Sequence, residues 1–539
     1  MIRRYLAALC WVVIALPGSA QQPVQSPRGE FEVTGRVVNS ITGEVVHRAF
    51  VQLASVARRA EVQHLEAASD GAFAFHHLAP GKYNLIGQAR GFPPQSFDQH
   101  ENFNTAIVVG PDKVSTNILF RLRPDGSILG RVLDEHHEAV REAQVWLFQK
   151  RSDTGKLLIE PRSQMQTQDK GEYHFNHLGP GTYYVAVAAQ PWYRRYMQGV
   201  PRNIDPGQQK PEVDPALDVA YPLTYYPGAT EADSAGAIVV HAGDRITADF
   251  DLAPVASLHF TMRNSSPDGG QPAQPNFRQR VFGEPLVFLQ PSVIWGQGEI
   301  EVSGIAPGDY AFNLFHRDGN STTLRTQDVS LQQSGELDAS AAPTLERIHG
   351  QLKLDGARNL PNSFIQFRDA SSGRPISAAI DEHGEFTFQP EQPGRYGVAL
   401  ANAPGYAIRS IAATGATVNG RTIEFTGAQP VELTIEASQG VGTVNGTVMN
   451  GDKPLSGAMV VLVPQQIADN VSLFRRDQSD SDGTFTLPDV VPGRYTVIAL
   501  ENGWEMEWAS PEALRPYLPK GARVQIEGKQ QLEIRVAAQ

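Results

Sequence analysis

The sequence predicts an all-β protein composed of tandem Greek-key β-sandwich modules. Three observations support this fold class: one turn signature recurs five times, the recurrences are spaced by about one domain length, and hardly any segment has helical periodicity. The composition agrees, because 49 glycines and 38 prolines make up about 16% of the 539 residues, against roughly 12% in average usage. Short strands joined by tight turns need both residue types.

The signature consists of a glycine turn, an alternating apolar strand, a Pro-Gly-x-Tyr corner and a second alternating strand. It reads DGAFAFHHLAPGKYNLIG (70–87), DKGEYHFNHLGPGTYYVAV (169–187), GEIEVSGIAPGDYAFNL (298–314), GEFTFQPEQPGRYGVAL (384–400) and DGTFTLPDVVPGRYTVIAL (482–500). The corner prolines are 100, 127, 86 and 99 residues apart. This spacing suits sandwich domains and is too long for the turns of a solenoid.

Each part of the signature has a physical reason. Aromatic pairs such as Phe73 and Phe75 are two residues apart, so both side chains face the same side of a strand. At the corner, proline fixes φ and glycine accepts a positive φ, which predicts a type II turn. The following tyrosine is expected to bury its ring and to bond nearby backbone through its hydroxyl. We therefore predict five buried corner tyrosines: Tyr83, Tyr183, Tyr310, Tyr396 and Tyr495.

A glycine-containing strand precedes each corner by about 40–50 residues in units one, two, four and five, and the third unit is the least regular. The excess length of the second unit predicts an insertion at 191–233. The predicted divisions are a signal peptide at 1–20 and modules at 30–123, 124–254, 255–345, 346–438 and 439–539. With separate cores, the modules are expected to behave as independent units.

These segments resemble carboxypeptidase regulatory-like domains, which have a transthyretin-like (prealbumin-like) sandwich of the carbohydrate-binding-like fold. The shared pattern is G-x-V, an x-V-x-L strand, D-x-x-G-x-F-x-F and L-x-P-G-x-Y, as in residues 70–87. It covers units one, two, four and five well and unit three loosely. Residues 221–252 also resemble a piece of multi-module bacterial envelope proteins of this family. The resemblance implies the fold and leaves the function open.

The N-terminus predicts export. Arg3 and Arg4 precede an apolar run from Tyr5 to Leu16 and a small-residue cleavage site at 18–20, the pattern of a secretory signal peptide. Cys10, the single cysteine, lies inside this run. We therefore expect a mature chain without disulfides or a membrane span, in the periplasm, at the cell surface or outside the cell.

Charge and motifs exclude several function classes. Cleavage would leave 44 basic and 58 acidic side chains, and a net charge of −14 disfavours nucleic acid and anionic membranes as partners. The sequence has no zinc-peptidase motif, nucleophile elbow, P-loop or dinucleotide fingerprint, so we predict no catalytic residue, no metal and no cofactor. His77 and His177 are better explained as polar edge residues than as ligands. Turn chemistry explains Asp480 and Asp482 better than a calcium loop does.

Aromatic residues outside the repeat are the candidate ligand-binding site. Flat rings beside polar groups suit stacking on sugars or gripping a peptide, whereas the alternative is that the loops fold back and bury their rings. The insertion and the segment after the last corner supply these candidates: Trp192, Tyr193, Tyr196, Tyr225, Tyr226, Trp504 and Trp508.

The leading interpretation is a non-catalytic binding and scaffold protein of the cell envelope, with a polysaccharide or an envelope protein as partner. The alternatives are a structural spacer or protein-interaction chain, and an accessory protein for a separately encoded hydrolase. The sequence leaves the ligand and the oligomeric state open.

The signal-peptide hypothesis predicts cleavage after Ala20, because Gly18 and Ala20 supply the small residues that signal peptidase requires. N-terminal sequencing of the exported protein should begin at Gln21. A mature protein that retains Met1 would contradict export by this route.

Overall fold

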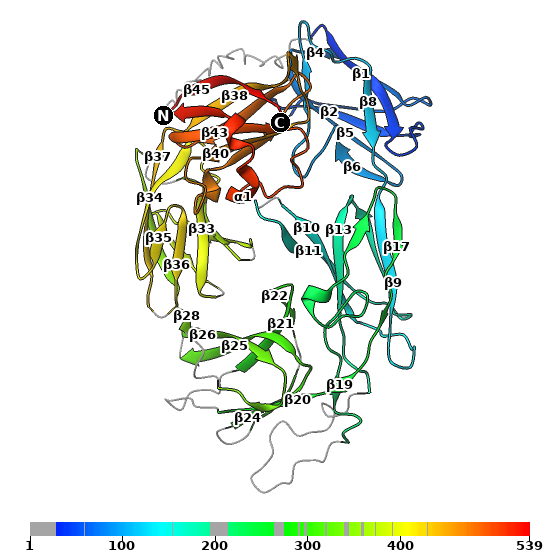
Figure 1. Cartoon of the computed structure of the whole chain (residues 1–539), viewed down its shortest axis with the longest axis vertical. Helices are drawn as coiled ribbons and strands as arrows, with labels where there is room; N and C mark the ends of the chain where they lie inside the picture. The colour runs from blue at the N-terminus through cyan, green and yellow to red at the C-terminus, as the bar shows by residue number, and fades with distance from the viewer. Residues whose placement is uncertain are drawn as a thin grey trace, which may run out of the picture.

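The computed structural model describes residues 29–539 except 59, 153–154, 194–213, 264–273, 289–290, 296–298, 319–320, 339–343, 346, 357–359, 372, 391 and 428. The predicted signal peptide lies outside the described residues. The described part is built of strands grouped into sandwiches, and we name five successive groups modules 1 to 5 (Figure 1). The all-β fold class predicted from the sequence is confirmed.

The first two modules contain the strands β1 to β18 in chain order. Module 1 comprises β1 (Phe31–Asn39), β2 (Phe50–Ser55), β3 (Val62–Glu66), β4 (Ala72–Leu78), β5 (Gly81–Ala89), β6 (Phe92–Ser96), β7 (Ile107–Val109) and β8 (Ile118–Leu122). Module 2 comprises β9 (Gly126–Leu133), β10 (Gln144–Arg151), β11 (Leu158–Gln166), β12 (Glu172–Leu178), β13 (Gly181–Ala188), β14 (Val219–Ala220), β15 (Thr224–Tyr225), a 3-10 turn η1 (Ala232–Ser234), β16 (Ile238–Val240), β17 (Arg245–Thr247) and β18 (Phe250–Asp251). The short strand β19 (Val255–Ala256) pairs with β14 and leads into module 3.

The remaining modules repeat the plan. Module 3 comprises β20 (Leu258–Arg263), β21 (Gln274–Val281), β22 (Glu284–Phe288), β23 (Ser292–Trp295), β24 (Glu299–Ile305), β25 (Gly308–Asp318), β26 (Ser321–Leu331), β27 (Gly335–Glu336) and β28 (Thr344–Leu345). Module 4 comprises β29 (Ile348–Leu354), β30 (Phe364–Asp369), β31 (Pro375–Ala379), β32 (Glu385–Phe388), β33 (Gly394–Ala401), β34 (Tyr406–Thr414), β35 (Thr417–Asn419), β36 (Thr422–Phe425) and β37 (Glu432–Gln439). Module 5 comprises β38 (Gly442–Asn450), β39 (Lys453–Pro454), β40 (Met459–Pro464), η3 (Val471–Leu473), β41 (Arg475–Gln478), β42 (Thr484–Val490), β43 (Gly493–Leu500), α1 (Pro511–Leu514), η4 (Leu518–Lys520), β44 (Ala522–Ile526) and β45 (Gln531–Ala537).

Every module packs two sheets face to face. In module 1 the sheets are β4-β1-β8 and β3-β2-β5-β6, with β7 also pairing with β5. The first strand of each module pairs in parallel with a late strand of the same module: β1 with β8, β9 with β17 and β18, β20 with β27, β29 with β37, and β38 with β45. This pairing brings the two ends of each module together, so the chain leaves a module beside the strand on which it entered.

The corner tyrosines are buried as predicted, and each hydroxyl donates to a main-chain carbonyl four residues earlier. The bonds are Tyr83 to Ala79 (2.8 Å), Tyr183 to Gly179 (2.9 Å), Tyr310 to Ala306 (2.6 Å), Tyr396 to Gln392 (2.8 Å) and Tyr495 to Val491 (2.7 Å). The exposed fraction of these tyrosines is at most 5%. Each ring therefore fills a core while its hydroxyl satisfies a carbonyl of the corner.

The predicted type II turn is wrong in its geometry. The corner glycines of modules 1 to 4 have φ between 150° and 158°, where a type II turn would need about 80°. The left-handed residue instead lies three positions before the proline, at His77 (φ 58°), His177 (φ 57°), Gly304 (φ 85°) and Asp489 (φ 52°). His77 and His177 thus occupy a turn that His, Asn and Asp tolerate better than other side chains.

Each module has its own apolar core. The inward aromatic pairs are buried as the alternation predicts, with Phe73 4% and Phe75 2% exposed, and Tyr396 0% exposed in module 4. Separate clusters of buried residues fill modules 1, 2, 3, 4 and 5. Each sandwich can therefore form its core from a continuous stretch of sequence.

The modules do not behave as separate beads, because the chain closes into a ring. In Figure 1 modules 1 to 5 follow one another clockwise, and module 5 returns to module 1. Between them, the Ala106 amide donates to Asp480 Oδ1 (3.1 Å) and the Ser481 amide donates to the Ala106 carbonyl (2.9 Å). Lys82 Nζ lies 2.5 Å from Asp480 Oδ2, and Lys113 Nζ lies 2.6 Å from Asp482 Oδ2. The acidic turn of module 5 is therefore used to dock module 1.

Buried polar groups reinforce this closure. Gln478 is 1% exposed, and its amide nitrogen donates to the Asp98 carbonyl (2.6 Å) and to Thr105 Oγ1 (2.8 Å). Arg476 Nη2 lies 2.7 Å from Glu101 Oε2, with side chains only 7% and 15% exposed. The expectation of independent modules is thus corrected: the cores are separate, but the modules are docked by satisfied buried groups.

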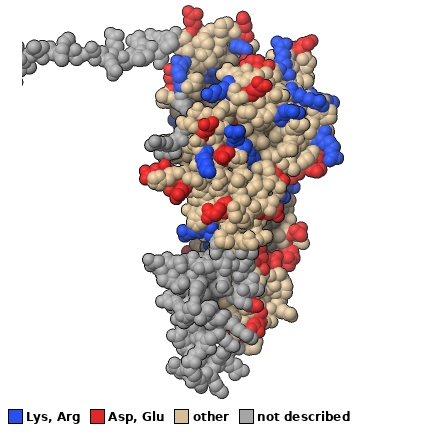
Figure 2. Space-filling model, turned by 90° about the vertical axis from the view of Figure 1, so that its left-hand side faces the viewer, with Lys and Arg blue, Asp and Glu red and all other residues tan. Residues whose placement is uncertain are grey.

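The outer face of modules 4 and 5 carries charges of both signs. Figure 2 shows acidic and basic side chains interspersed over this face, without a large area of one sign among the coloured residues. No helix in the described ranges is long and apolar enough to cross a bilayer.

Replacing a corner tyrosine tests the corner interaction. Tyr83→Ala should lower the free energy of unfolding by about 3–5 kcal/mol, as for other buried aromatic truncations. Tyr83→Phe, which removes only the hydroxyl that donates to Ala79, should cost about 1 kcal/mol. Denaturant unfolding measures both. Equal losses for the two variants would show that the hydroxyl, and not the ring, stabilises the corner.

Replacing Arg476 tests the ring closure. Arg476→Ala leaves Glu101 buried without its partner, so we expect a loss of about 3–5 kcal/mol and a larger radius of gyration in X-ray scattering. Arg131→Ala is the control, because the Arg131–Glu172 pair (2.9 Å) is 60% and 44% exposed and should contribute about 0–1 kcal/mol. An unchanged radius in both variants would contradict closure through this pair.

Candidate functional site

Tyr225, one of the predicted ligand-binding residues, instead docks module 3 onto module 2. It is 3% exposed, and its ring centroid lies 5.0 Å from that of Phe282. Phe148 and Tyr184 also surround Phe282, at 4.9 and 5.3 Å. Burial raises the pKa of Tyr225 to about 12. The expected exposure of Tyr225 is therefore corrected, because its aromatic ring is buried in the contact between modules 2 and 3.

The hairpin that carries Phe282 is shaped for this contact. Phe282 (φ 50°) and Gly283 (φ 84°) are the two turn residues between β21 and β22, and both adopt the left-handed conformation of a type I′ turn. An aromatic residue is unfavourable there by roughly 1–2 kcal/mol. The aromatic cluster of module 2 that receives the ring offsets this cost.

Trp504 and Trp508 join module 5 to its neighbours. The Trp504 ring stacks on His100 of module 1 (centroids 5.0 Å apart, 7° between planes), and its Nε1 donates to the Gly457 carbonyl. Trp508 is 7% exposed and lies under the Arg476 guanidinium, 4.3 Å from the ring centroid. A Cβ at Gly155 would lie 2.4 Å from the Ala509 Cβ, so only glycine permits this approach of module 2. The expected exposure of Trp508 is corrected, and Trp504 is half-buried.

The insertion begins with Trp192, whose ring is exposed, and Tyr193, whose hydroxyl is bonded to Glu135. Trp192 is 75% exposed and meets Tyr193 edge-on, with centroids 5.9 Å apart. Tyr193 and Tyr221 donate to the two oxygens of Glu135, at 2.5 and 2.8 Å. Burial and the Glu135 charge raise the pKa of Tyr193 to about 12. Burial acts to raise the pKa of Glu135, but the hydrogen bonds from the two tyrosine hydroxyls and from the backbone lower it below its usual range.

The remaining insertion residues contribute less. Tyr226 is half-buried against the module 2 core, 6.1 Å from Phe250. Tyr196 lies outside the described residues. Asp134, Glu135 and His136 lie close enough to share an ion, but the tyrosine hydroxyls already satisfy Glu135 and the cluster is a local turn. The described part of the insertion thus packs on module 2 and, through Tyr225, on module 3, and Trp192 is its exposed ring.

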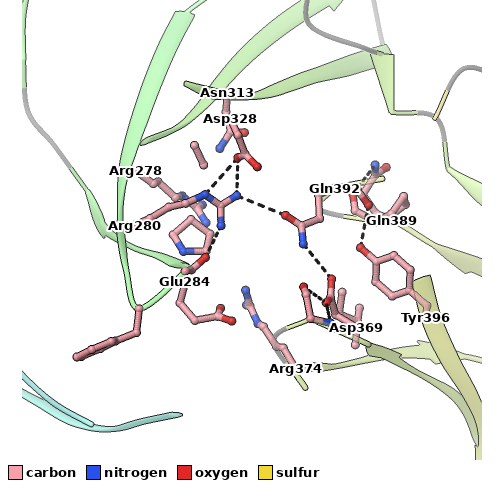
Figure 3. A pocket seen from close by; sticks show the side chains of 17 residues that line it. Arg278, Arg280, Glu284, Asn313, Asp328, Asp369, Arg374, Gln389, Gln392 and Tyr396 are labelled. Atoms are coloured by element: carbon pink, nitrogen blue, oxygen red, sulfur yellow. Dashed lines mark hydrogen bonds and ion pairs between the residues drawn. The ribbon is translucent and has the colours of Figure 1, made fainter. Parts of the chain in front are cut away.

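One cleft lies between modules 3 and 4, with a volume of about 680 Å³. Arg278, Arg280, Glu284, Asp328, Asp369 and Arg374 line it, so three cations face three carboxylates. Figure 3 shows that Arg280 reaches Asp328 and Gln392, and that Gln392 reaches Asp369. The charges of this cleft are balanced and the hydrogen bonds join its two walls, as expected of a polar junction between modules.

A second cleft, which we call the junction cleft, has a volume of about 790 Å³ where modules 1, 2 and 5 meet. Its walls are the 93–102 loop and Arg123 of module 1, the β10–β11 hairpin and Pro-Gly corner of module 2, and Trp504 and Glu505 of module 5. Four of its lining side chains are cations and two are carboxylates: Arg123, Lys150, Arg151 and Arg162, and Glu101 and Glu505. Within a chain of net charge −12, the cleft is locally cationic.

The walls of the junction cleft are fixed by hydrogen bonds. Arg123 donates through Nη2 to the Gln99 carbonyl (3.0 Å), and Gln95 Nε2 donates to the Arg123 carbonyl (2.9 Å). Ser152 Oγ bonds to Glu101 and to the Trp504 carbonyl, both at 3.3 Å. Three modules are thereby held in register around a preformed polar hollow, the usual form of a small-ligand site.

A β-bulge directs Arg162 into the junction cleft. On edge strand β11, Ser163 pairs with Leu147 and Pro161 pairs with Phe148, so Arg162 is the extra residue. Bulges re-aim side chains and are common beside functional sites. Burial raises the pKa of Tyr183 at the corner, whereas the nearby charges of Arg162 and Arg151 lower it. Both guanidinium groups therefore converge on the corner of module 2.

The sequence analysis did not identify this cleft, apart from Trp504. Gln149 and Arg151 are two residues apart at the end of a strand, which signals a shared polar face. No local pattern, however, indicates that residues near 100, 150 and 504 meet.

Comparison with known proteins supports the module type. Residues 32–123 match the family model of the carboxypeptidase regulatory-like domain, and residues 440–513 match that of the BOS complex subunit NOMO1-like, second beta sandwich domain. "Chitinase ChiA" from Flavobacterium johnsoniae is 25% identical over 172 residues, and this match spans 32% of the chain but only 10% of that protein.

Solved structures with similarity include pilins and a putative carbohydrate binding protein. A streptococcal ancillary pilin is 13% identical, with 52% of this chain and 98% of that chain covered and a TM-score of 0.19. The TIE protein of Bacillus anthracis is 12% identical (94% and 74% covered, TM-score 0.17), and a putative carbohydrate binding protein from Bacteroides uniformis is 13% identical (30% and 90%, TM-score 0.14). Scores this low do not establish a common arrangement of modules.

Proposed function

We propose that this chain, whose residues 32–123 belong to the carboxypeptidase regulatory-like domain family, is a non-catalytic scaffold and binding protein of the cell envelope that holds a polysaccharide in the junction cleft. Export rests on the predicted signal peptide at 1–20. The family and the neighbouring folds are binding or structural types, which supports a role without catalysis.

The observation that carries the proposal is the closure of module 5 onto modules 1 and 2. The Ala509 amide donates to the Gly155 carbonyl (3.1 Å), and the Leu157 amide donates to Glu507 Oε1 (3.0 Å). Together with the Arg476–Glu101 pair, these contacts assemble a hollow that no single module contains. A rigid ring presents such a hollow without an ordering cost when a ligand binds.

The lining suits a sugar polymer. Amides of Asn102 and Gln149 offer donors and acceptors for hydroxyl groups, and Trp504 supplies an aromatic surface. A long polymer could also reach Trp192, whose exposed ring stays a second proposed contact, together with Tyr193. Several weak contacts along one polymer reinforce each other.

A structural spacer is the second candidate. Its support is that Tyr225, Trp504 and Trp508 act as docking residues. These aromatic side chains stiffen the closed arrangement of modules. An accessory role beside a separately encoded hydrolase is compatible with the chitinase match and would use the same cleft. Binding of a polysaccharide separates the first candidate from the spacer.

Affinity electrophoresis of the mature chain against a panel of neutral, acidic and amino polysaccharides tests the function. We expect retardation by at least one polymer, lost in Asn102→Phe, because a bulky ring on this exposed wall fills the cleft. Trp192→Ala, an exposed ring outside the cleft, should weaken retention only slightly.

Each variant must keep the melting temperature of the parent chain. Retention that survives Asn102→Phe but is lost in Trp192→Ala would move the site to the insertion. No retention by any polymer would overturn the binding role and leave the spacer.

A further inference from the structure

We infer that the ligand of the junction cleft is a polysaccharide bearing carboxylates, a polyuronate, whose acid groups pair with Arg162 and Lys150. This inference rests on the proposed function and adds the charge class of the ligand. It comes from three features of the cleft: its excess of cations, the placement of two of them, and the contrast with the other cleft.

The first feature is the charge of the lining. Glu101 is committed to Arg476 at 2.7 Å, so its charge is neutralised inside the protein. Arg123 lies in the field of Asp98 of its own module, so Lys150 and Arg162 are the cations proposed to bind the ligand, with Glu505 as the other lining carboxylate. A polymer carrying one carboxylate per sugar would supply negative charge to these two cations.

The second feature is the position of Lys150 and Arg162. Both side chains are exposed, and within the described ranges neither has a carboxylate at ion-pair distance. They extend from paired strands, Lys150 from β10 and Arg162 from the bulge of β11, and so are placed by a sheet. An arginine can bind a carboxylate through two parallel N–H donors, which a neutral sugar does not match.

The third feature is the comparison with the cleft between modules 3 and 4. There Arg280 is paired with Asp328, and Gln392 links it to Asp369, so cations and carboxylates are equal in number (Figure 3). A junction can therefore be closed with balanced charge, and the imbalance of the junction cleft is a separate property of that site.

Calorimetry with an oligogalacturonate and with the same oligomer fully methyl-esterified tests the inference, because esterification removes the charge of every carboxylate and leaves the sugar backbone unchanged. We expect binding of the acid form, weakened by salt, and much weaker binding of the ester. Arg162→Gln and Lys150→Gln should each weaken binding of the acid by about fivefold, and the double variant by roughly 25-fold if the two act independently.

Arg409→Gln is the matched control. Arg409 is also an exposed arginine in a β-bulge of an edge strand, on β34 of module 4, but it does not line the cleft. The Arg409→Gln variant should bind the oligogalacturonate with the affinity of the parent chain.

Equal affinity for the acid and the ester would overturn the inference and leave neutral sugar binding intact. An equal loss in Arg409→Gln and Arg162→Gln would also overturn it, because the attraction would then come from overall charge. If the parent chain binds neither oligomer but is retained by a neutral polysaccharide, the charge class fails and the proposed function stands.

Discussion

The architecture depends on the buried contact between modules 1 and 5, at the far ends of the chain. Arg476 lies between the Trp508 and Phe103 rings, at 4.3 and 5.0 Å from their centroids, and pairs with Glu101. Removing two such charges from water is costly, and the cost is offset only when geometry and additional contacts are good. The pair therefore stabilises one arrangement of modules more than it stabilises either module, and the junction cleft exists only in that arrangement.

Main-chain bonds give this contact its specificity. The Ser481 amide donates to the Ala106 carbonyl and the Ala106 amide donates to Asp480 Oδ1, which requires one register, and the Gln478 side chain is satisfied only when module 1 is in place. Undocking would expose apolar rings and leave polar groups to be resolvated. The closed arrangement of modules is thus favoured over an open chain by many small interactions that all require the same geometry.

The local fold was predictable from the sequence, and the reason is the range of the interactions. Strand alternation and the tyrosine corner act within about ten residues, so Phe73, Phe75 and Tyr83 could be placed in a core without a structure. The left-handed turn at His77 was missed because the Pro-Gly pair beside it is a stronger turn signal. The closure of the modules into a ring was not predicted, because Glu101 and Arg476 are 375 residues apart and form no sequence pattern.

The aromatic residues show why site prediction failed where fold prediction succeeded. A ring outside the repeat, flanked by charged residues, serves equally well to grip a ligand or to dock a neighbouring module. Sequence cannot separate these uses, because each requires a flat apolar face in a polar loop. In Tyr225 docking prevails, since its ring is buried against Phe282 of module 3. Trp508, in contrast, is buried among residues of its own module and beneath Arg476. Ligand binding therefore depends on side chains that are not used to dock modules. At the junction of modules 1, 2 and 5 these are Lys150, on strand β10, and Arg162, in the bulge of β11.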